Sequence, residues 1–302
     1  AMTVQFKSIL CKELSDFLGF REKTLSKSAY CHDRLYLQRL DKYLCSGKYS
    51  TKELSEECLT GWINTLSGKT VTIANEVIVI RLFLEFLKSL GIPAYTPPVP
   101  KVHDDYIPYI FSDAELDSIF VAADSLEYGK SAVFLDSYIE FPMVLRLMYG
   151  CGLRVGETVS LKMEDVDLDT GVLTLKRTKR NKQRLVPMHT SLMIVLKKYC
   201  MAMGIVGEPN AFLFPCQTKD SSMSPHTAQH RFEFVLRNAD IFLPGRQKHQ
   251  RGPCLHCLRH VFAFKSFTNA ERAGKRIDDS IPYLSIYLGH DRLRETEKYL
   301  RF

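Results

Sequence analysis

Near its middle, the sequence places an arginine directly after a glycine turn. In Gly150-Cys-Gly-Leu-Arg154-Val-Gly-Glu157, Arg154 starts a predicted helix and Glu157 follows one turn later, where its carboxylate could orient the guanidinium. A guanidinium binds phosphate oxygens through planar, bidentate hydrogen bonds. The segment is therefore compatible with phosphate chemistry, although a single arginine has a structural role far more often than a catalytic one.

A second segment, His256-Cys-Leu-Arg259-His260, groups two imidazoles and a guanidinium. On a helix, residues 256, 259 and 260 share one face. They could bind a phosphate there, or they could be satisfied polar groups at a helix end. Cys254 and Cys257 add two zinc ligand types, but residues 256 and 257 point away from each other on a helix and no second Cys/His pair lies at finger spacing. We therefore expect no metal site.

Close to the C-terminus, Tyr287-Leu-Gly-His290 is followed nine residues later by Tyr299. A tyrosine hydroxyl is a weak nucleophile at its ordinary pKa of about 10. Adjacent cations would favour the phenolate, and His256 is a candidate to accept its proton. A lone tyrosine or histidine has a structural explanation far more often than a catalytic one, and only the combination with the two arginines raises these residues above that background. The sequence has no evident carboxylate cluster for a two-metal mechanism.

Six basic residues lie within nine positions, between two segments that predict a β-hairpin. They are Lys176, Arg177, Lys179, Arg180, Lys182 and Arg184. A two-stranded ribbon with a cationic tip could reach a DNA backbone, although such a run is also typical of a solvated surface. The formal net charge of +7 likewise favours a polyanionic partner.

These residues must be positioned by a mostly helical chain. Apolar residues at three- and four-residue spacing predict helices over Val4–Phe17, Ala29–Leu44, Lys52–Leu66 and Thr70–Leu90. Four prolines between residues 92 and 101 cannot continue a helix and predict an extended connector. Beyond the connector, Ser112-Asp-Ala-Glu115 is a capping-box pattern that opens another helix. Further helices are predicted over Thr227–Ala239, His256–Ala270 and Ile281–Leu288.

We therefore expect a mainly α fold in three parts: a helical N-terminal domain over residues 1–94, a proline-rich linker over residues 95–110, and a second domain over residues 111–302. The second domain is expected to be mostly helical with one small β-hairpin sheet. No apolar run is long enough to span a membrane, and no signal peptide is evident. Nine cysteines, mostly inside apolar segments, fit reduced thiols and predict a cytoplasmic location.

The combination of these segments resembles the tyrosine recombinase (phage integrase) family. That family has an arginine in a G-L-R-x-x-E box and a lysine on a β-hairpin shortly before an R-x-x-P run. It also has an H-x-x-R-H box, an L-G-H box and a tyrosine nine residues beyond it. The matching residues here are Arg154 with Glu157; Lys179, whose register is fixed by Arg184-Leu-Val-Pro187; His256, Arg259 and His260; His290; and Tyr299.

The resemblance implies a site-specific DNA recombinase or integrase that works through a 3′-phosphotyrosyl intermediate, without ATP, metal or other cofactor. Tyr299 would be the nucleophile, Lys179 the general acid for the 5′-hydroxyl leaving group, and His290 a hydrogen-bond donor to the phosphate. Arg154 and Arg259 would clamp the phosphate, with His260 in a supporting place. The implied partner is double-stranded DNA, held between a core-DNA-binding domain and the catalytic domain. A homotetramer would form on two DNA sites during strand exchange.

Two other functions stay open. A type IB topoisomerase uses a similar set of residues, but the L-G-H box and the full H-x-x-R-H match favour a recombinase of simple two-domain type, either Xer-like or from a mobile element. A non-catalytic DNA-binding regulator would fit the loss of a catalytic position, and none is lost. The sequence ends three residues after Tyr299, where relatives usually continue through a helix that docks on a neighbouring protomer. Either the sequence is truncated there or this member assembles by other contacts.

Overall fold

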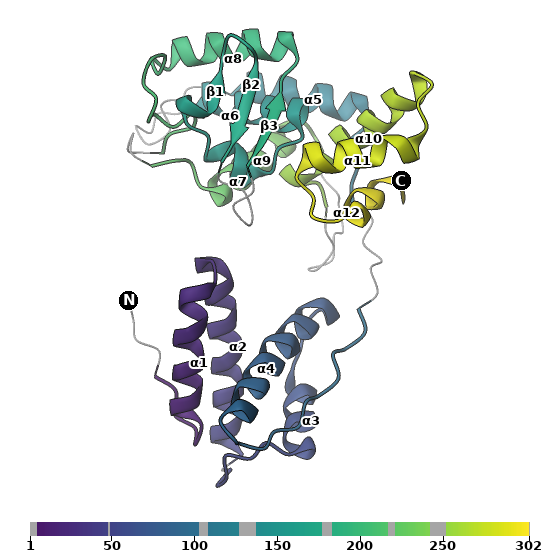
Figure 1. Cartoon of the computed structure of the whole chain (residues 1–302). Coiled ribbons are helices and arrows are strands. Elements are labelled where there is room, and N and C mark those ends of the chain that lie inside the picture. The colour runs from purple at the N-terminus through teal and green to yellow at the C-terminus, as the bar shows by residue number, and fades with distance from the viewer. Residues whose placement is uncertain are drawn as a thin grey trace. The chain divides into compact units, whose positions relative to one another are not determined.

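The computed structural model describes residues 5–47, 49–102, 108–126, 137–176, 183–216, 221–241 and 252–301. The chain divides into two compact units, residues 1–105 and 106–302, and each unit has its own apolar core (Figure 1). Most described residues are helical, and one three-stranded sheet lies in the second unit. This confirms the predicted mainly α fold class. None of the described helices has the length and apolar character that a membrane span requires.

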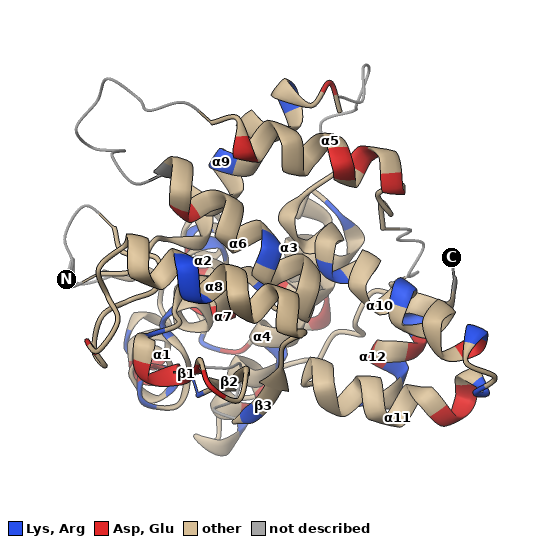
Figure 2. Cartoon of the chain, turned by 90° about the horizontal axis from the view of Figure 1, so that it is seen from above, with Lys and Arg blue, Asp and Glu red and all other residues tan. Residues whose placement is uncertain are grey.

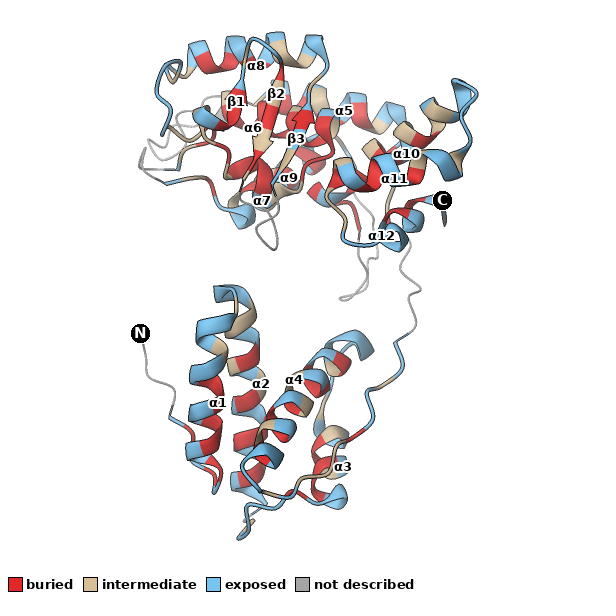
Figure 3. Ribbon diagram, in the orientation of Figure 1, coloured by how far each residue is buried: buried red, intermediate tan, exposed pale blue. Residues whose placement is uncertain are grey.

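The first unit consists of four described helices, which are α1 (Cys11–Thr24), α2 (Lys27–Ser46), α3 (Glu56–Thr65) and α4 (Thr70–Ser89). Each helix turns one apolar face inward, as the burial colouring shows (Figure 3). The buried side chains include Leu14, Leu40, Trp62 and Phe83, which are at most 1% exposed. The apolar side chains that recur at helical spacing in the sequence therefore pack together into one core of the first unit.

The first helix begins later than the sequence predicts. We expected a helix over Val4–Phe17, but α1 starts at Cys11. The Asp41 carboxylate of α2 accepts the backbone N–H groups of Lys7 and Ser8 at distances between 2.9 and 3.1 Å. These long-range hydrogen bonds satisfy the backbone donors outside a helix, and no periodicity in the sequence reveals them.

The third helix is also shorter than predicted. We expected it over Lys52–Leu66, but α3 starts at Glu56, with Ser55 as its N-cap. The residue ahead of the cap, Leu54, pairs instead with the chain after α4: its N–H donates to the Pro93 carbonyl at 3.2 Å, and its carbonyl accepts from Tyr95 at 2.8 Å. This bridge keeps the segment extended.

The second unit is built around α10 (Leu255–Arg272), which packs against α6 (Ser137–Cys151) and α11 (Ile277–Leu288). The predicted capping box forms at the start of α5 (Asp113–Asp124), where Ser112 and Glu115 exchange hydrogen bonds. The remaining elements are α7 (Val155–Val159), η2 (Met163–Asp165), α8 (Thr190–Ala202), α9 (Pro225–Asn238), α12 (Leu293–Glu297) and η4 (Lys298–Arg301).

The sheet has the order β1-β2-β3 and is antiparallel throughout. Its strands are β1 (Val166–Asp167), β2 (Val172–Leu175) and β3 (Arg184–Pro187). The last two form the predicted hairpin, with Leu175 opposite Arg184. The sequence did not reveal β1, because two residues are too few for an alternating pattern. Contacts between β3 and α11 bring the hairpin to the C-terminal helices.

Candidate active site

The turn after α11 is the centre of the candidate site. Gly289 caps the helix with a φ of +67°, a left-handed conformation that glycine adopts without strain. A Cβ atom at this position would come within 2.8 Å of the Arg184 guanidinium. The sequence therefore needs glycine here both for the turn and for the close approach of an arginine. The backbone carbonyls of Leu288 and Gly289 face the surrounding guanidinium groups.

Arg259 projects from α10 into this turn and is only 1% exposed. Its Nη1 donates to the Gly152 carbonyl at 2.6 Å, and its Nη2 donates to the Leu288 carbonyl at 2.7 Å. Burial lowers the pKa of Arg259 to about 10, against an opposing effect of Tyr299. The hydrogen bonds of this buried cation thus go to neutral acceptors, and its positive charge remains available to an anion.

Glu157, which is 5% exposed, joins two further arginines. Arg184 donates from Nη1 and Nη2 to the two carboxylate oxygens at 2.9 and 2.8 Å, and Arg154 donates from Nη1 at 2.9 Å. Burial alone would raise the pKa of Glu157, but the hydrogen bonds and charges of both arginines lower it to about 2. Arg154 also reaches the Leu288 and Gly289 carbonyls at 3.4 and 3.3 Å. Glu157 therefore orients Arg154 toward the turn.

The prediction that Arg184 contacts DNA does not fit its surroundings. Its side chain is 10% exposed, both Nη atoms bind Glu157, and Nε donates to the Tyr287 carbonyl at 2.9 Å. All three nitrogens are occupied inside the protein, so Arg184 is a positioning residue. Arg184 is the first residue of β3 and not part of the hairpin tip, and this position in the strand is the sequence feature that distinguishes it from the other basic residues.

Tyr299 lies between two histidine rings and is 6% exposed. Its ring centroid is 5.9 Å from that of His290, with the planes 18° apart, and 5.2 Å from that of His260. His256 is exposed in the first turn of α10, and its ring centroid is 4.7 Å from that of His260. Because η4 packs against α10, the tyrosine comes to lie beside this histidine-bearing helix.

The two inner histidines are held neutral. Burial lowers the pKa of His260 and of His290 to about 3, and nearby positive charge, including that of Arg259, acts in the same direction. His290 Nε2 lies 3.1 Å from Arg259 Nη2, and its Nδ1 lies 2.7 Å from the Thr296 hydroxyl. A guanidinium can only donate, so Nε2 accepts and Nδ1 carries the proton. Neither ring nitrogen of His260 has a hydrogen-bond partner among the described residues.

Several predicted residues are not brought into this cluster. Lys176 stands at the base of the hairpin, where its Nζ lies 2.9 Å from Asp165 Oδ1. Thr296, which is fully buried, is a site residue that the sequence did not reveal, because a threonine six positions after a histidine carries no distinctive signal.

Within the described ranges, no group of three or more His, Cys, Asp or Glu is arranged to hold a metal ion. The predicted residues Arg177, Lys179, Arg180 and Lys182 lie outside the described residues.

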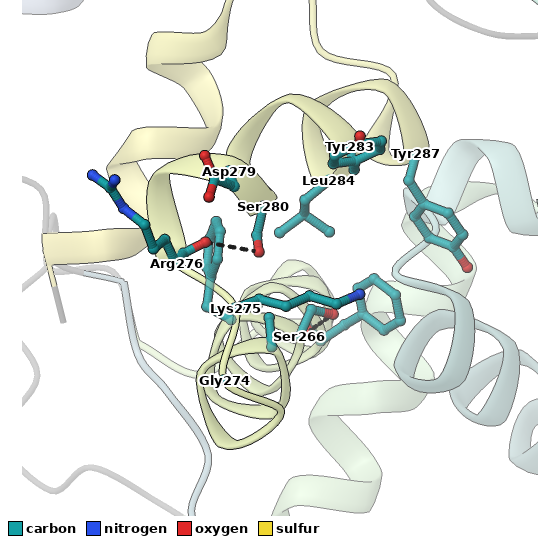
Figure 4. A pocket seen from close by; sticks show the side chains of 12 residues that line it. Ser266, Gly274, Lys275, Arg276, Asp279, Ser280, Tyr283, Leu284 and Tyr287 are labelled. Atoms are coloured by element: carbon teal, nitrogen blue, oxygen red, sulfur yellow. Dashed lines mark hydrogen bonds between the residues drawn. The ribbon is translucent and has the colours of Figure 1, made fainter.

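A groove of about 820 Å³ lies between α10 and α11 (Figure 4). Its walls are largely apolar and include Phe262, Phe267, Tyr283 and Leu284. It shares Tyr287 with the candidate site, since the backbone carbonyl of that residue accepts from Arg184. None of the predicted catalytic side chains lines the groove, so we treat it as separate from the site.

Residues 114–302 match the phage integrase family. The integrase/recombinase y4rB of Sinorhizobium fredii (strain NBRC 101917 / NGR234) is 32% identical over 200 residues, which are 64% of this chain and 61% of that protein. The chain spans 61% of the length of y4rB and 59% of the length of y4rE from the same strain, less than two thirds of either. Tyrosine recombinase XerD of Rickettsia conorii (strain ATCC VR-613 / Malish 7) is 26% identical over 266 residues, 80% of each chain.

Solved structures share the fold. The XerH site-specific recombinase bound to its difH substrate has a TM-score of 0.68 at 18% identity, covering 96% of this chain and 80% of that one. The Tn1549 transposon integrase in complex with transposon right end DNA also has a TM-score of 0.68, at 13% identity, covering 96% of this chain and 94% of that one.

Proposed function

The chain belongs to the phage integrase family, and on this premise we propose that it is a site-specific DNA recombinase that cleaves and rejoins strands through a 3′-phosphotyrosyl link to Tyr299. The observation that carries the proposal is the convergence of Arg154, Arg259 and His290 at the turn after α11, with the Tyr299 ring stacked on His290. A nucleophile beside two guanidinium groups is what in-line attack on a phosphodiester requires.

The two arginines supply the phosphate clamp. The hydrogen-bond acceptors of Arg259 among the described residues are neutral, so a phosphate can take over its hydrogen bonds without separating an ion pair. Arg154 keeps one Nη on Glu157 and makes only long hydrogen bonds to the turn, so its other Nη can turn toward a phosphate oxygen. Preorganised donors of this kind stabilise the charge that develops on the phosphorane, each by about 3 kcal/mol.

Proton transfer is assigned to two side chains, and a third, His290, is assigned a hydrogen bond to the phosphate. His256 accepts the Tyr299 proton, and Lys179 protonates the 5′-oxygen, as the family resemblance implies. His290 has its Nε2 engaged as an acceptor from Arg259. It can donate to a phosphate only after Nε2 gains a proton, which the negative charge of the phosphate would favour.

The proposed partner is double-stranded DNA, with a tetramer on two sites during strand exchange. The XerH and Tn1549 structures are complexes with DNA. Helix α5 carries Asp113, Glu115, Asp117 and Asp124 and no basic residue, so its acidic surface does not suit a phosphate backbone (Figure 2). We expect DNA to bind the hairpin and the site instead. The phosphotyrosyl link conserves the energy of the broken bond, so rejoining needs neither ATP nor metal.

The test compares the natural sequence with Tyr299→Phe on nicked duplexes from the ends of the surrounding genetic element, in EDTA. We expect an SDS-resistant protein–DNA band with the natural sequence alone. Tyr283→Phe is the matched control, because Tyr283 is 78% exposed and lies outside the site; it should form the band. A band with Tyr299→Phe, or a strict need for magnesium, would refute the mechanism. Relaxation of plasmids that lack a recombination site would favour a topoisomerase.

A further inference from the structure

Two cysteines frame the first turn of α10. Cys254 is the N-cap, in extended backbone conformation, and Cys257 is the third helical residue. An N-cap side chain normally accepts the N–H of the second or third helical residue, but the Cys254 thiol makes no such bond. Gln229 caps the turn from α9 by accepting the Leu255 N–H at 3.3 Å. The Cys254 sulfur instead lies 3.6 Å from the Cys257 sulfur.

The two thiols differ in accessibility and in proton affinity. Cys254 is partly exposed, whereas Cys257 is fully buried. The hydrogen bond to Cys254, together with burial, raises the pKa of the Cys257 thiol. The N-terminus of this 18-residue helix favours negative charge on a sulfur atom placed there. Cys254 is therefore the sulfur that meets an external reagent, and Cys257 is the one that resolves the product.

We infer that Cys254 and Cys257 form a reversible dithiol–disulfide site, oxidised by small-molecule disulfides, and that the closed form slows strand cleavage. The Cys254 thiolate attacks one sulfur of the small disulfide, breaks its S–S bond and releases one thiolate. The Cys257 sulfur then attacks the Cys254 sulfur and displaces the second small thiolate, and the protons lost by Cys254 and Cys257 end on the two released thiolates. Two protein thiols are oxidised and one small disulfide is reduced to two thiols.

The effect on cleavage follows from the place of His256, which lies between the two cysteines in the same turn. Ring closure must bring the sulfurs from 3.6 Å to about 2 Å, and the turn has to absorb this change. A displacement of about 1 Å at a catalytic group can slow a reaction by about 100-fold. This half of the inference rests on the proposed function, in which His256 accepts the tyrosine proton.

The first experiment treats the full chain with oxidised glutathione and maps each cysteine by mass spectrometry. We expect the peptide with Cys254 and Cys257 to lose two hydrogens and to carry no glutathione. Cys31, which is exposed, should keep a mixed disulfide as the internal control. In Cys257→Ala, glutathione should remain on Cys254. A stable glutathione adduct on Cys254 in the natural sequence, or two unmodified thiols, would overturn the inference. This readout does not depend on recombinase activity.

The second experiment measures the rate of covalent DNA complex formation before and after oxidation. We expect the oxidised chain to be slower by at least about 10-fold and to recover fully with dithiothreitol. Cys254→Ser should keep its rate under the same oxidant. An unchanged rate in chains that mass spectrometry shows to be oxidised would overturn the regulatory half. If the reduced chain forms no covalent complex at all, the proposed function has failed and not the thiol chemistry.

Discussion

At the scale of single residues, Glu157 holds two arginines in place, and its titration should be measurable. Its pKa of about 2 lies below the ordinary value of 4.5, so its stabilising effect is complete above pH 4.5 and is lost as the pH falls toward 2. The shift corresponds to roughly 3 kcal/mol. In Glu157→Gln we expect the free energy of unfolding at neutral pH to fall by about 3 kcal/mol, measured by urea unfolding.

The matched control is Glu164→Gln. Glu164 is 40% exposed and lies 3.8 Å from Lys176, so its loss should cost less than about 1 kcal/mol. The acid-induced loss of stability below pH 4.5 should also become shallower in Glu157→Gln only. Equal effects of the two substitutions would show that the buried carboxylate contributes no more than a surface charge.

His260 should make the fold sensitive to mild acid. Its folded-state pKa of about 3 lies below the ordinary 6.5. Between these two values the His260 imidazole binds a proton in the unfolded chain but stays neutral in the folded chain. Stability therefore falls as the pH drops from 6.5 toward 3, by about 1.4 kcal/mol per pH unit. In His260→Leu, the loss between pH 6.5 and about pH 5 should be smaller by about 2 kcal/mol. Urea unfolding at the two pH values measures it, with His226→Leu at an exposed position as the matched control.

At the scale of elements, the C-cap of α11 combines a turn with a contact. Gly289 and Gly274 both have positive φ, +67° and +73°, but a Cβ atom would meet the Arg184 guanidinium only at Gly289 and nothing within 4 Å at Gly274. Gly274→Ala should cost about 1–2 kcal/mol from backbone strain alone. Gly289→Ala should cost more and should also reduce covalent complex formation at least about 10-fold, because Arg184 and Glu157 must shift. If both variants cleave DNA equally well, the contact with Arg184 has no catalytic consequence.

Most helices and the hairpin were predictable because they repeat an apolar spacing, and Ser112 to Glu115 carries its own cap signal. The start of α1 was not, because it depends on an Asp41 carboxylate more than thirty positions away. The same limit applies to the site. Family spacing pointed to the residue types, but only the folded chain shows that Arg184 pairs with Glu157 and that Thr296 contacts His290. Long-range hydrogen bonds leave no periodic trace in the sequence.

At the scale of the whole molecule, each unit has its own core, so we expect the units to unfold separately. Leu40 is fully buried in the first unit, and Leu40→Ala should remove about 2–5 kcal/mol from that unit alone. Gly289→Ala should lower only the transition of the second unit. Differential scanning calorimetry of the full chain should then show two transitions that respond to different substitutions. A single transition that both variants shift together would mean that the units fold cooperatively.

The hydrogen bonds between the arginines and the backbone carbonyls also bear on the order of events during folding. Arg154 reaches the Leu288 and Gly289 carbonyls across 134 and 135 positions of the chain, and Arg259 reaches Gly152 across 107. Closing such distant segments is a slow step in folding, because the loop entropy is lost before the contacts form. In a partly folded chain, the arginine side chains are therefore not yet held in place by the turn after α11. Under the proposed function, the ability to cleave DNA should therefore be the last property that the folding chain acquires.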